Sequence, residues 1–563
     1  MNCPICGFAV DERSNLCGQC GARLLKCAKC NTMHKSSSKF CDVCGYRLSL
    51  RPDIQKRQPK IVLHKKRTRK SVASTLTFYG GVNEIGGNKI LLEDMDTKVF
   101  LDFGMSFSRA GKFFSEFLQP RQCNGLGDFF ELGLLPDLKG LYRNDYLKHM
   151  GRKQEKNECQ GVLLSHAHLD HAAYIHFLRE DIPIYCSKPT NAILKALNDT
   201  SSGRFNDLTD ITTRFETYIN KNGLRSRKTS RNPEIKQQRK FENFEFGKKF
   251  RIDNLEIIPF NVDHSLPGST AYMIYTSSGI VAYTGDFRFH GRRPKATSNF
   301  LEACRKEKPD VLIIEGTRID KKTTRKEKDV ESEVSKIVNE HNGLSVCNWP
   351  VRDTDRMLSF LNVAKKLDKK LAISLKQAYL LSQLNGCDDK VPNLADNNLA
   401  LYATRKSWGL IGSNWEEKTI KEDYAKWEHQ YLSDSICYKD IRKNQSGFLF
   451  FCTNFTLPDL LDLKPPKNSV YIKSTCEPFD TEMEMDWERV NNWINHLGMN
   501  VQETHVSGHA CGPELKHMIE IVNPKIVVPV HTHNAEIYKQ MFKNTHLLEG
   551  LEETVEIGIN SKL

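Results

Sequence analysis

Four side chains that suit metal ions stand within six residues of one another. The segment reads His166-Ala167-His168-Leu169-Asp170-His171 and follows an apolar stretch, 161–165. At the end of a strand His166 and His168 project to the same side and can bind one ion, while Asp170 and His171 enter the next turn and can bind another. A lone histidine is more often structural than a metal ligand. Structural roles do not readily explain three histidines and an aspartate within six residues. We expect a zinc-binding site here.

Eight of the 18 cysteines lie in the first 44 residues as four Cys-x-x-Cys pairs. The pairs are Cys3/Cys6 with Cys17/Cys20, and Cys27/Cys30 with Cys41/Cys44. Two such pairs make a tetrahedral zinc site, and modules this small need the metal to fold. We expect two closed structural Zn²⁺ sites with no catalytic water. His34, between the pairs, is expected at the surface. The ribbons could contact nucleic acid, contact a protein or regulate assembly.

The other ten cysteines are scattered singly, as in a protein of a reducing compartment. No apolar run approaches the roughly 20 residues that cross a bilayer, and the first residues do not resemble a signal peptide. We therefore expect a cytoplasmic protein that does not enter a membrane.

Positive charge is concentrated in two places. The net charge is +13, residues 51–70 hold nine Lys or Arg against one Asp, and residues 225–240 hold seven against one Glu. Such stretches suit a polyanionic partner, because each neutralised phosphate releases counterions. The alternative is a solvated linker and a solvated loop, and charge alone favours nucleic acid.

Further along the chain, apolar strands end in polar residues that could take part in chemistry. The predicted strands 255–262, 280–284, 311–314 and 526–530 lead to Asp263-His264, Gly285-Asp286, Glu315-Gly316-Thr317 and His531. Strand ends fix the backbone while the loops project side chains. A helix is expected over 172–179. Residues 330–490 alternate helical periods with short strands, which predicts an α/β domain inserted before strand character returns at 501–505.

The His166–His171 cluster resembles the HxHxDH signature of the metallo-β-lactamase superfamily. The resemblance extends to His264, Asp286 and His531 as the remaining ligands. It implies two catalytic Zn²⁺, one held by His166, His168 and His264 and another by Asp170, His171 and His531, with Asp286 bridging them.

Within that superfamily three further motifs resemble the β-CASP nucleases, and ribonuclease J in particular. These are Glu315-Gly316-Thr317, Ser507-Gly508-His509-Ala510 and His531, and the glycine-rich loop 80–88 is also similar. The resemblance implies hydrolysis of RNA to leave 5′-phosphates, as a 5′ exonuclease and/or an endonuclease in RNA processing or decay.

The resemblance also suggests roles for individual residues. Asp170 is a catalytic metal ligand, and His509 contacts phosphate or protonates the leaving oxygen. Ser507 orients a neighbouring phosphate, and Glu315 holds a ligand histidine in its tautomer. Asp102, after another apolar strand, either does similar work or caps a helix or a turn.

The expected fold class is α/β: a four-layer αββα sandwich with an inserted β-CASP α/β domain, preceded by two small zinc ribbons. The expected boundaries are 1–48 for the double ribbon, 49–72 for a basic linker, 73–335 and 496–563 for the two parts of the metallo-β-lactamase domain, and 336–495 for the β-CASP domain.

Three departures from ribonuclease J are visible. Thr532-His533-Asn534 stands where that family has Gly-Glu, about 30 residues follow His531 where a C-terminal domain is expected, and the ribbons are an addition. Two other functions stay open: a DNA nuclease of the β-CASP repair type, and a zinc-ribbon RNA-binding or assembly protein with minor catalysis. A homodimer, and a protein partner held by the ribbons, stay open too.

Overall fold

The computed structural model describes residues 73–558, except 116, 202–204, 228–235, 323–324 and 477–480, and the parts of the first 44 residues around the cysteines. The chain divides into two compact units, Met1–Lys70 and Ser71–Leu563. The basic segment 51–70 and the middle of 225–240 lie outside the described residues.

In the described part of the first unit, β1 (Leu24–Lys26) pairs antiparallel with β2 (Met33–Lys35). Its small core consists of Cys3, Val10, Cys17 and Leu24. The expectation that His34 lies at the surface is wrong, because its side chain is buried and its Nδ1 lies 3.3 Å from Asp42 Oδ1.

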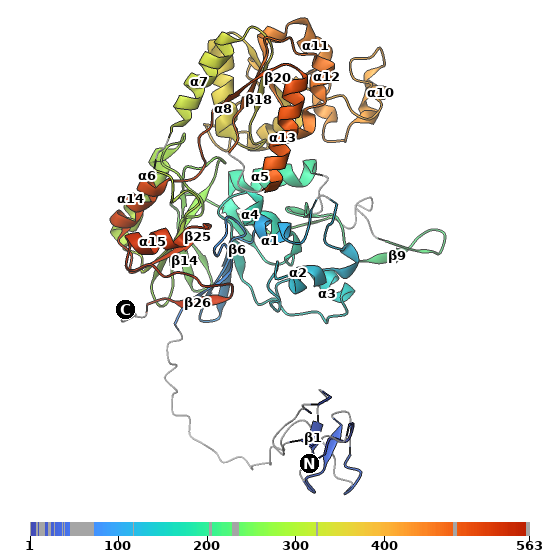
Figure 1. Cartoon of the computed structure of the whole chain (residues 1–563), viewed down its shortest axis with the longest axis vertical. Helices are drawn as coiled ribbons and strands as arrows, with labels where there is room; N and C mark the ends of the chain where they lie inside the picture. The colour runs from blue at the N-terminus through green and yellow to red at the C-terminus, as the bar shows by residue number, and fades with distance from the viewer. Residues whose placement is uncertain are drawn as a thin grey trace. The chain divides into compact units, whose positions relative to one another are not determined.

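Two sheets face each other in the second unit (Figure 1). One has the order β12 (Phe241–Phe244), β7 (Ile184–Ser187), β6 (Gly161–Leu163), β5 (Thr97–Leu101), β4 (Lys89–Asp94), β3 (Thr75–Gly80), β26 (Glu553–Glu556). The other has the order β13 (Phe250–Ile252), β14 (Leu255–Asn261), β15 (Thr270–Tyr275), β16 (Ile280–Tyr283), β17 (Val311–Glu315), β25 (Ile526–Val530).

The alternation of side chains along each strand explains the layers. Ile90 and Leu92 of β4 face the other sheet, whereas Leu91 between them faces outward. Val311 and Ile313 of β17 likewise join the inter-sheet core, and Leu312 faces outward. Helices cover both outer faces: α2 (Gly127–Glu131), α3 (Asn144–His149) and α5 (Lys188–Thr200) on one, α6 (Pro294–Glu307) and α14 (Gly512–Val522) on the other. The four-layer αββα architecture is confirmed.

Short elements accompany these layers: α1 (Phe107–Gly111), β8 (Asp210–Ile211) with β11 (Gln237–Gln238), the exposed hairpin of β9 (Thr217–Ile219) and β10 (Arg225–Arg227), and α15 (Ala535–Met541). The helix expected over 172–179 is instead α4 (Leu169–Ala172) followed by a 3-10 turn, Ala173–Phe177. The Phe103 backbone explains this, because its N–H donates to His171 O and its carbonyl accepts from Tyr174 N.

The inserted domain has its own parallel sheet. Its order is β21 (Ser435–Ile436), β20 (Leu399–Tyr402), β19 (Lys370–Ser374), β22 (Phe448–Phe451), β18 (Ser345–Asn348), β23 (Val470–Lys473), β24 (Asn500–Glu503). The sheet thus extends past residue 495, where we expected the domain to end. Its helices are α7 (Glu327–Glu340), α8 (Thr354–Lys366), α9 (Leu375–Leu384), α10 (Glu417–Ile420), α11 (Tyr438–Lys443), α12 (Asp459–Leu463) and α13 (Thr481–His496). None of the described helices has the length and apolar character needed to cross a membrane.

Buried ion pairs join the inserted domain to the sandwich. Asp355, in the first turn of α8, accepts from Arg288 Nη2 at 2.8 Å and from Arg293 Nη1 at 2.6 Å. Both arginines follow β16, and all three side chains are buried. Arg356 pairs with Glu327 at 2.7 Å and donates to Val506 O at 3.0 Å.

Candidate metal centre

The residues expected at the site come together at the ends of neighbouring strands. Asp102 follows β5, the His166–His171 segment follows β6, His264 follows β14, Asp286 follows β16, Glu315 ends β17 and His531 follows β25. The two sheets therefore bring side chains separated by more than 400 residues to one edge of the sandwich.

The first group of ligand atoms consists of His166, His168, His264 and Asp286. His168 Nδ1 lies 2.9 Å from His166 Nε2 and 3.2 Å from His264 Nε2. Two nitrogens bound to one tetrahedral Zn²⁺ at its usual bond length stand about 3.3 Å apart. The three imidazoles therefore fit a single zinc ion.

The second group consists of Asp170, His171 and His531. Asp170 Oδ2 lies 3.2 Å from His531 Nε2 and 3.8 Å from His171 Nε2. Asp286 lies between the groups: its Oδ2 is 3.3 Å from His171 Nε2 and 3.6 Å from His166 Nε2. One carboxylate oxygen thus faces ligand nitrogens of both groups, as a bridging ligand must.

Two buried atoms of this cluster have no hydrogen-bond partner among the described residues: His171 Nε2 and Asp286 Oδ1. An unsatisfied buried polar atom is costly, and both atoms are of types that bind zinc. Burial also lowers the pKa of His168 to about 3 and the pKa values of His166 and His264 well below the ordinary range. These imidazoles are therefore held in the neutral form that binds metal.

Neighbouring groups fix the orientation of four of the five ligand imidazoles. His171 Nδ1 donates to Asp102 Oδ2 at 2.7 Å, and His264 Nδ1 donates to Gly508 O at 2.6 Å. The Nδ1 atoms of His166 and His531 meet the hydroxyls of Ser165 and Thr317 at 2.9 and 2.8 Å. These contacts leave Nε2 of all four rings toward the centre.

Asp102 is the partner for which sequence reasoning left two roles open. It is fully buried and also accepts from Ser165 Oγ at 2.7 Å and Tyr283 OH at 2.6 Å. The sequence signal for Asp102 was its position directly after an apolar strand. Thr317 and Gly508 belong to motifs visible in the sequence, but their hydrogen bonds to His531 and His264 were not predicted.

The three other predicted catalytic residues lie beside the metal groups. Glu315 Oε2 accepts from His509 Nδ1 at 3.0 Å, so Glu315 orients His509, whereas we expected it to orient a ligand histidine. Burial opposes protonation of His509, but the Glu315 and Asp286 carboxylates raise its pKa to about 9. Ser507 Oγ accepts from His509 N at 3.2 Å, and both residues are part-exposed.

The loop 80–88 holds the backbone of Asp170 by hydrogen bonds. The amides of Gly87 and Asn88 donate to Asp170 O at 2.9 and 3.2 Å. Buried Lys89 holds the loop by donating to Gly87 O and Gly104 O at 2.9 and 3.0 Å. His533, the departure from the ribonuclease J pattern, contacts Asn83 O of the same loop at 3.2 Å.

Both cysteine sets are assembled as expected. The Sγ atoms of Cys3 and Cys20 lie 3.8 Å apart, and those of Cys6 and Cys17 lie 3.6 Å apart. In the second set the separations are 3.6 Å for Cys27 and Cys44 and 3.4 Å for Cys30 and Cys41. Four thiolates on one tetrahedral Zn²⁺ stand about 3.8 Å apart, and a disulfide is far shorter.

Comparison with known proteins identifies three domains. Residues 3–45 match the double zinc ribbon, residues 135–344 the β-lactamase superfamily domain, and residues 496–545 the Zn-dependent metallo-hydrolase RNA specificity domain.

Full-length relatives are distant. Ribonuclease J 2 of Staphylococcus aureus (strain NCTC 8325 / PS 47) is 23% identical over 471 residues, which are 80% of this chain and 67% of that protein. Ribonuclease J 2 of Staphylococcus epidermidis is 22% identical over 471 residues, which are again 80% of this chain and 67% of that protein. A crystal structure of a protein of unknown function from Enterococcus faecalis V583 has a TM-score of 0.62 at 20% identity, covering 86% of this chain and all of that one, which shows a shared fold.

The fold, the ligand groups and the matched domains agree: the chain is a metal-dependent hydrolase of the metallo-β-lactamase fold, carrying a double zinc ribbon and a metallo-hydrolase RNA specificity domain.

Proposed function

We propose that this protein is a two-zinc ribonuclease that hydrolyses RNA phosphodiester bonds and leaves 5′-phosphates. The observation that carries the proposal is the position of Asp286, whose Oδ2 lies 3.3–3.9 Å from nitrogens of His166, His171, His264 and His531. His166, His168 and His264 would hold one ion, Asp170, His171 and His531 the other, and Asp286 both. Bound zinc supplies an activated water and charge stabilisation for the scissile phosphate.

Side chains of the protein bind and orient the RNA and supply a proton. His509, kept cationic by Glu315, is placed to hold a phosphate oxygen or to give a proton to the leaving 3′-oxygen. Ser507 and the Gly508 amide orient an adjacent phosphate. Asp102 keeps the His171 imidazole in the tautomer that binds metal through Nε2. Arg352, in the loop between β18 and α8, adds positive charge that acts on Asp170 and His168.

RNA is the favoured substrate because the RNA specificity domain includes Ser507, Gly508, His509 and His531, and because the relatives named ribonuclease J 2 match most of the chain. The test uses RNA and DNA strands of one sequence, with 5′-monophosphate or 5′-hydroxyl ends. The zinc-loaded protein should cleave the RNA and leave 5′-phosphates. Immediate mononucleotides would identify a 5′ exonuclease and intermediate fragments an endonuclease. Preference for DNA would contradict the assignment of substrate.

A further inference from the structure

Two arginine side chains near the metal centre have no partner of opposite charge among the described residues. Arg318 directly follows the Glu315-Gly316-Thr317 motif at the end of β17, and Arg352 lies in the loop between β18 and α8. Both residues are part-exposed, and neither side chain makes a hydrogen bond or an ion pair with a described residue. One arginine belongs to the sandwich and the other to the inserted domain.

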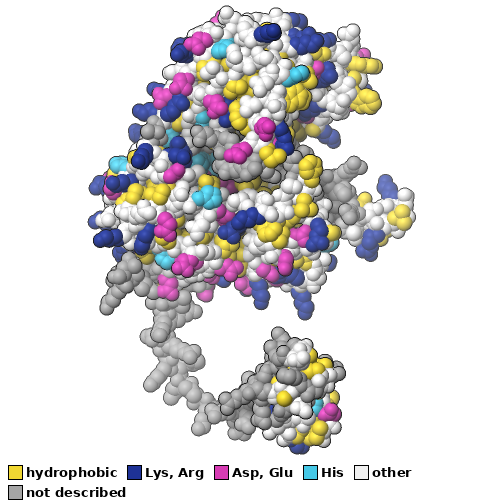
Figure 2. Space-filling view, in the orientation of Figure 1, with side chains coloured by type: hydrophobic (Ala, Val, Ile, Leu, Met, Phe, Trp, Pro, Cys, Tyr) yellow, Lys and Arg dark blue, Asp and Glu magenta, His cyan; other side chains and the backbone are white. Residues whose placement is uncertain are grey.

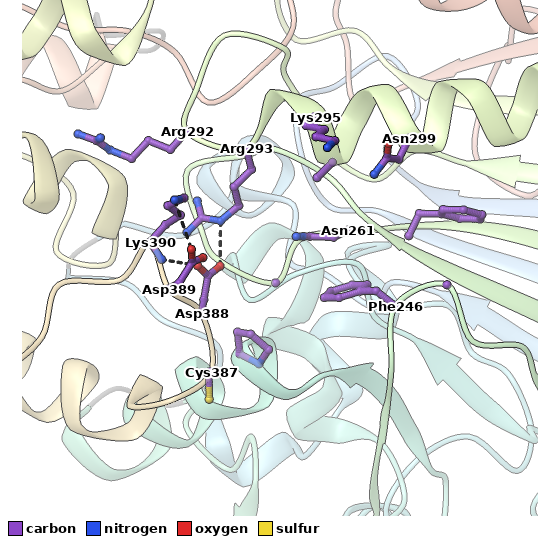
Figure 3. A pocket seen from close by; sticks show the side chains of 15 residues that line it. Phe246, Asn261, Arg292, Arg293, Lys295, Asn299, Cys387, Asp388, Asp389 and Lys390 are labelled. Carbon is purple, nitrogen blue, oxygen red and sulfur yellow. Dashed lines mark hydrogen bonds and ion pairs between the residues drawn. The ribbon is translucent and has the colours of Figure 1, made fainter.

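Other arginines in this part of the molecule are neutralised by carboxylates. Figure 3 shows one of them, Arg293, which donates to Asp388 at 2.8 Å. Three more are paired in the same way: Arg288 with Asp263 and Asp355, Arg292 with Glu331, and Arg356 with Glu327. A charge that is taken out of water costs free energy unless it is paired. Arg318 and Arg352 differ from these arginines in lacking such a carboxylate.

The loop that carries Arg352 is fixed against the catalytic side of the sandwich. Arg288 donates to Asp355, in the first turn of α8, at 2.8 Å. The same guanidinium donates to the carbonyl oxygens of Ser507 at 3.0 Å and His264 at 3.4 Å. The start of α8, three residues after Arg352, is thereby held against a metal ligand and a predicted phosphate-binding residue.

Electrostatic effects place Arg352 near ligands of both zinc groups. Burial lowers the pKa of Arg352, and the Asp170 carboxylate counteracts this effect. Burial also lowers the pKa of His168, and the Arg352 charge lowers it further. Asp170 belongs to the second ligand group and His168 to the first. The guanidinium therefore acts on the place where a scissile phosphate meets the metal centre.

Arg318 lies beside the segment 505–511, which contains the predicted phosphate-binding residues. Its backbone forms an isolated parallel bridge with Cys511. Burial and the Arg356 charge lower the pKa of His505 to about 3, and the Arg318 charge lowers it further. Arg318 thus acts on the two ends of this segment, neither of which is a metal ligand.

An unpaired guanidinium in a partly buried position suits an anionic ligand. Its planar set of N–H donors matches the oxygens of a phosphate, which it can bind through two bonds at once. Asp170 is not that partner for Arg352, because its Oδ2 lies 3.2 Å from His531 Nε2 within the second ligand group. Lys and Arg side chains also lie on both the sandwich and the inserted domain around the hollow between them (Figure 2). A phosphodiester strand in that hollow therefore meets positive charge from both domains.

We propose that Arg352 and Arg318 bind two phosphates of the substrate strand, Arg352 the scissile phosphate and Arg318, together with Ser507, the adjacent one. The inserted domain thereby supplies a catalytic residue of its own. Neither arginine belongs to the motifs that resemble ribonuclease J. The inference rests on the proposed function in taking a phosphodiester strand as the substrate.

The first measurement compares two substrates of the zinc-loaded protein: end-labelled RNA, and bis(p-nitrophenyl) phosphate, a diester with no adjacent phosphate. Arg352→Gln should lower kcat on both substrates about 100-fold. Arg318→Gln should lower kcat/KM for RNA about tenfold and leave the rate on the small diester unchanged. Free guanidinium ion should restore part of the activity of Arg352→Ala, which a merely structural role would not allow. Arg442→Gln, at an exposed arginine of α11 without an ion pair to a described residue, is the matched control and should change neither rate.

The second measurement does not depend on cleavage. In an Asp170→Ala/His171→Ala background the affinity for RNA is measured at several salt concentrations. Arg352→Gln and Arg318→Gln should each reduce the slope of log affinity against log salt by about 0.7, the value for one phosphate contact on a single strand. Arg442→Gln should leave the slope unchanged.

Unchanged rates and unchanged salt slopes in both arginine variants would overturn the proposal. Rate losses that accompany a loss of bound zinc and are not restored by guanidinium would overturn it as well. Cleavage of DNA in place of RNA by the unaltered protein would instead count against the proposed function. The same comparisons on a DNA strand would then still test the two arginines, so the two failures are distinguishable.

Discussion

At the scale of single residues, the metal centre depends on atoms that do not themselves face the metal. Asp102 receives four hydrogen bonds, from His171 Nδ1, Tyr283 OH, and the amide and hydroxyl of Ser165. It does so from a left-handed backbone conformation, with φ 57°. A buried carboxylate with this many donors sets the direction of the ligand ring.

Asp102→Asn should therefore lower zinc affinity and cleavage rate about 10–100-fold. Asparagine tolerates the left-handed conformation, so folding should be retained. The measurements are zinc content after dialysis and the initial rate of cleavage. Asp253→Asn, at another left-handed position (φ 47°) but on the surface, is the control and should change neither. Full zinc occupancy and rate in the Asp102 variant would refute the positioning role.

At the scale of elements, strand ends were predictable and helix details were not. The strands leading to His166, His264, Asp286 and His531 were visible because apolar runs stop at polar residues. The break between α4 and the 3-10 turn depends on a hydrogen bond to Phe103, far away in sequence, and the buried position of His34 depends on the packing of the ribbon. Local patterns carry no information on such contacts.

The folding free energy of the inserted domain should depend on pH through one residue of its short helix α12. Burial raises the pKa of Asp459, in α12, to about 6, although Thr404 Oγ1 donates to it at 2.8 Å. Because the folded-state pKa is raised, folding is favoured at low pH and loses free energy as pH rises from about 4 through 6. Above that pH range the Asp459 carboxylate is ionised, and the full free-energy cost of burying its charge opposes folding.

Asp459→Asn removes this ionisation and should raise the free energy of unfolding at pH 8 by up to about 3 kcal/mol. The gain should be smaller at pH 5, where part of the folded population still holds the proton. Urea unfolding at the two pH values measures both numbers. An equal gain at pH 5 and pH 8 would show that ionisation of Asp459 is not the cause.

At the scale of the whole second unit, charge buried between the sandwich and the inserted domain holds the two together. The insertion itself was predictable, because site residues reappear late in the chain. The ion pairs of Asp355 with Arg288 and Arg293 were not, since neither arginine belongs to a recognisable motif. Arg288 also donates to Ser507 O at 3.0 Å, which ties this junction to the catalytic side.

Asp355→Asn removes the carboxylate that two buried guanidinium groups share. It should cost about 1–3 kcal/mol of unfolding free energy, because Arg293 keeps Asp388 and Arg288 keeps Asp263 as partners. Protease should then cut between the sandwich and the inserted domain faster than in the unaltered protein. Asp389→Asn, which breaks an exposed pair in the same domain, is the matched control and should change little. Equal stability of the two variants would contradict a structural role for the buried junction.

We propose that the metal centre holds two zinc ions and cleaves RNA. The most direct measurement combines zinc content with a cleavage time course on end-labelled RNA for the Asp170→Ala/His171→Ala variant. The variant should lose one catalytic zinc per chain and all phosphodiester cleavage, while its thermal unfolding and its affinity for uncleaved RNA stay close to those of the unaltered protein. Cleavage retained by that purified variant would contradict the two-metal account.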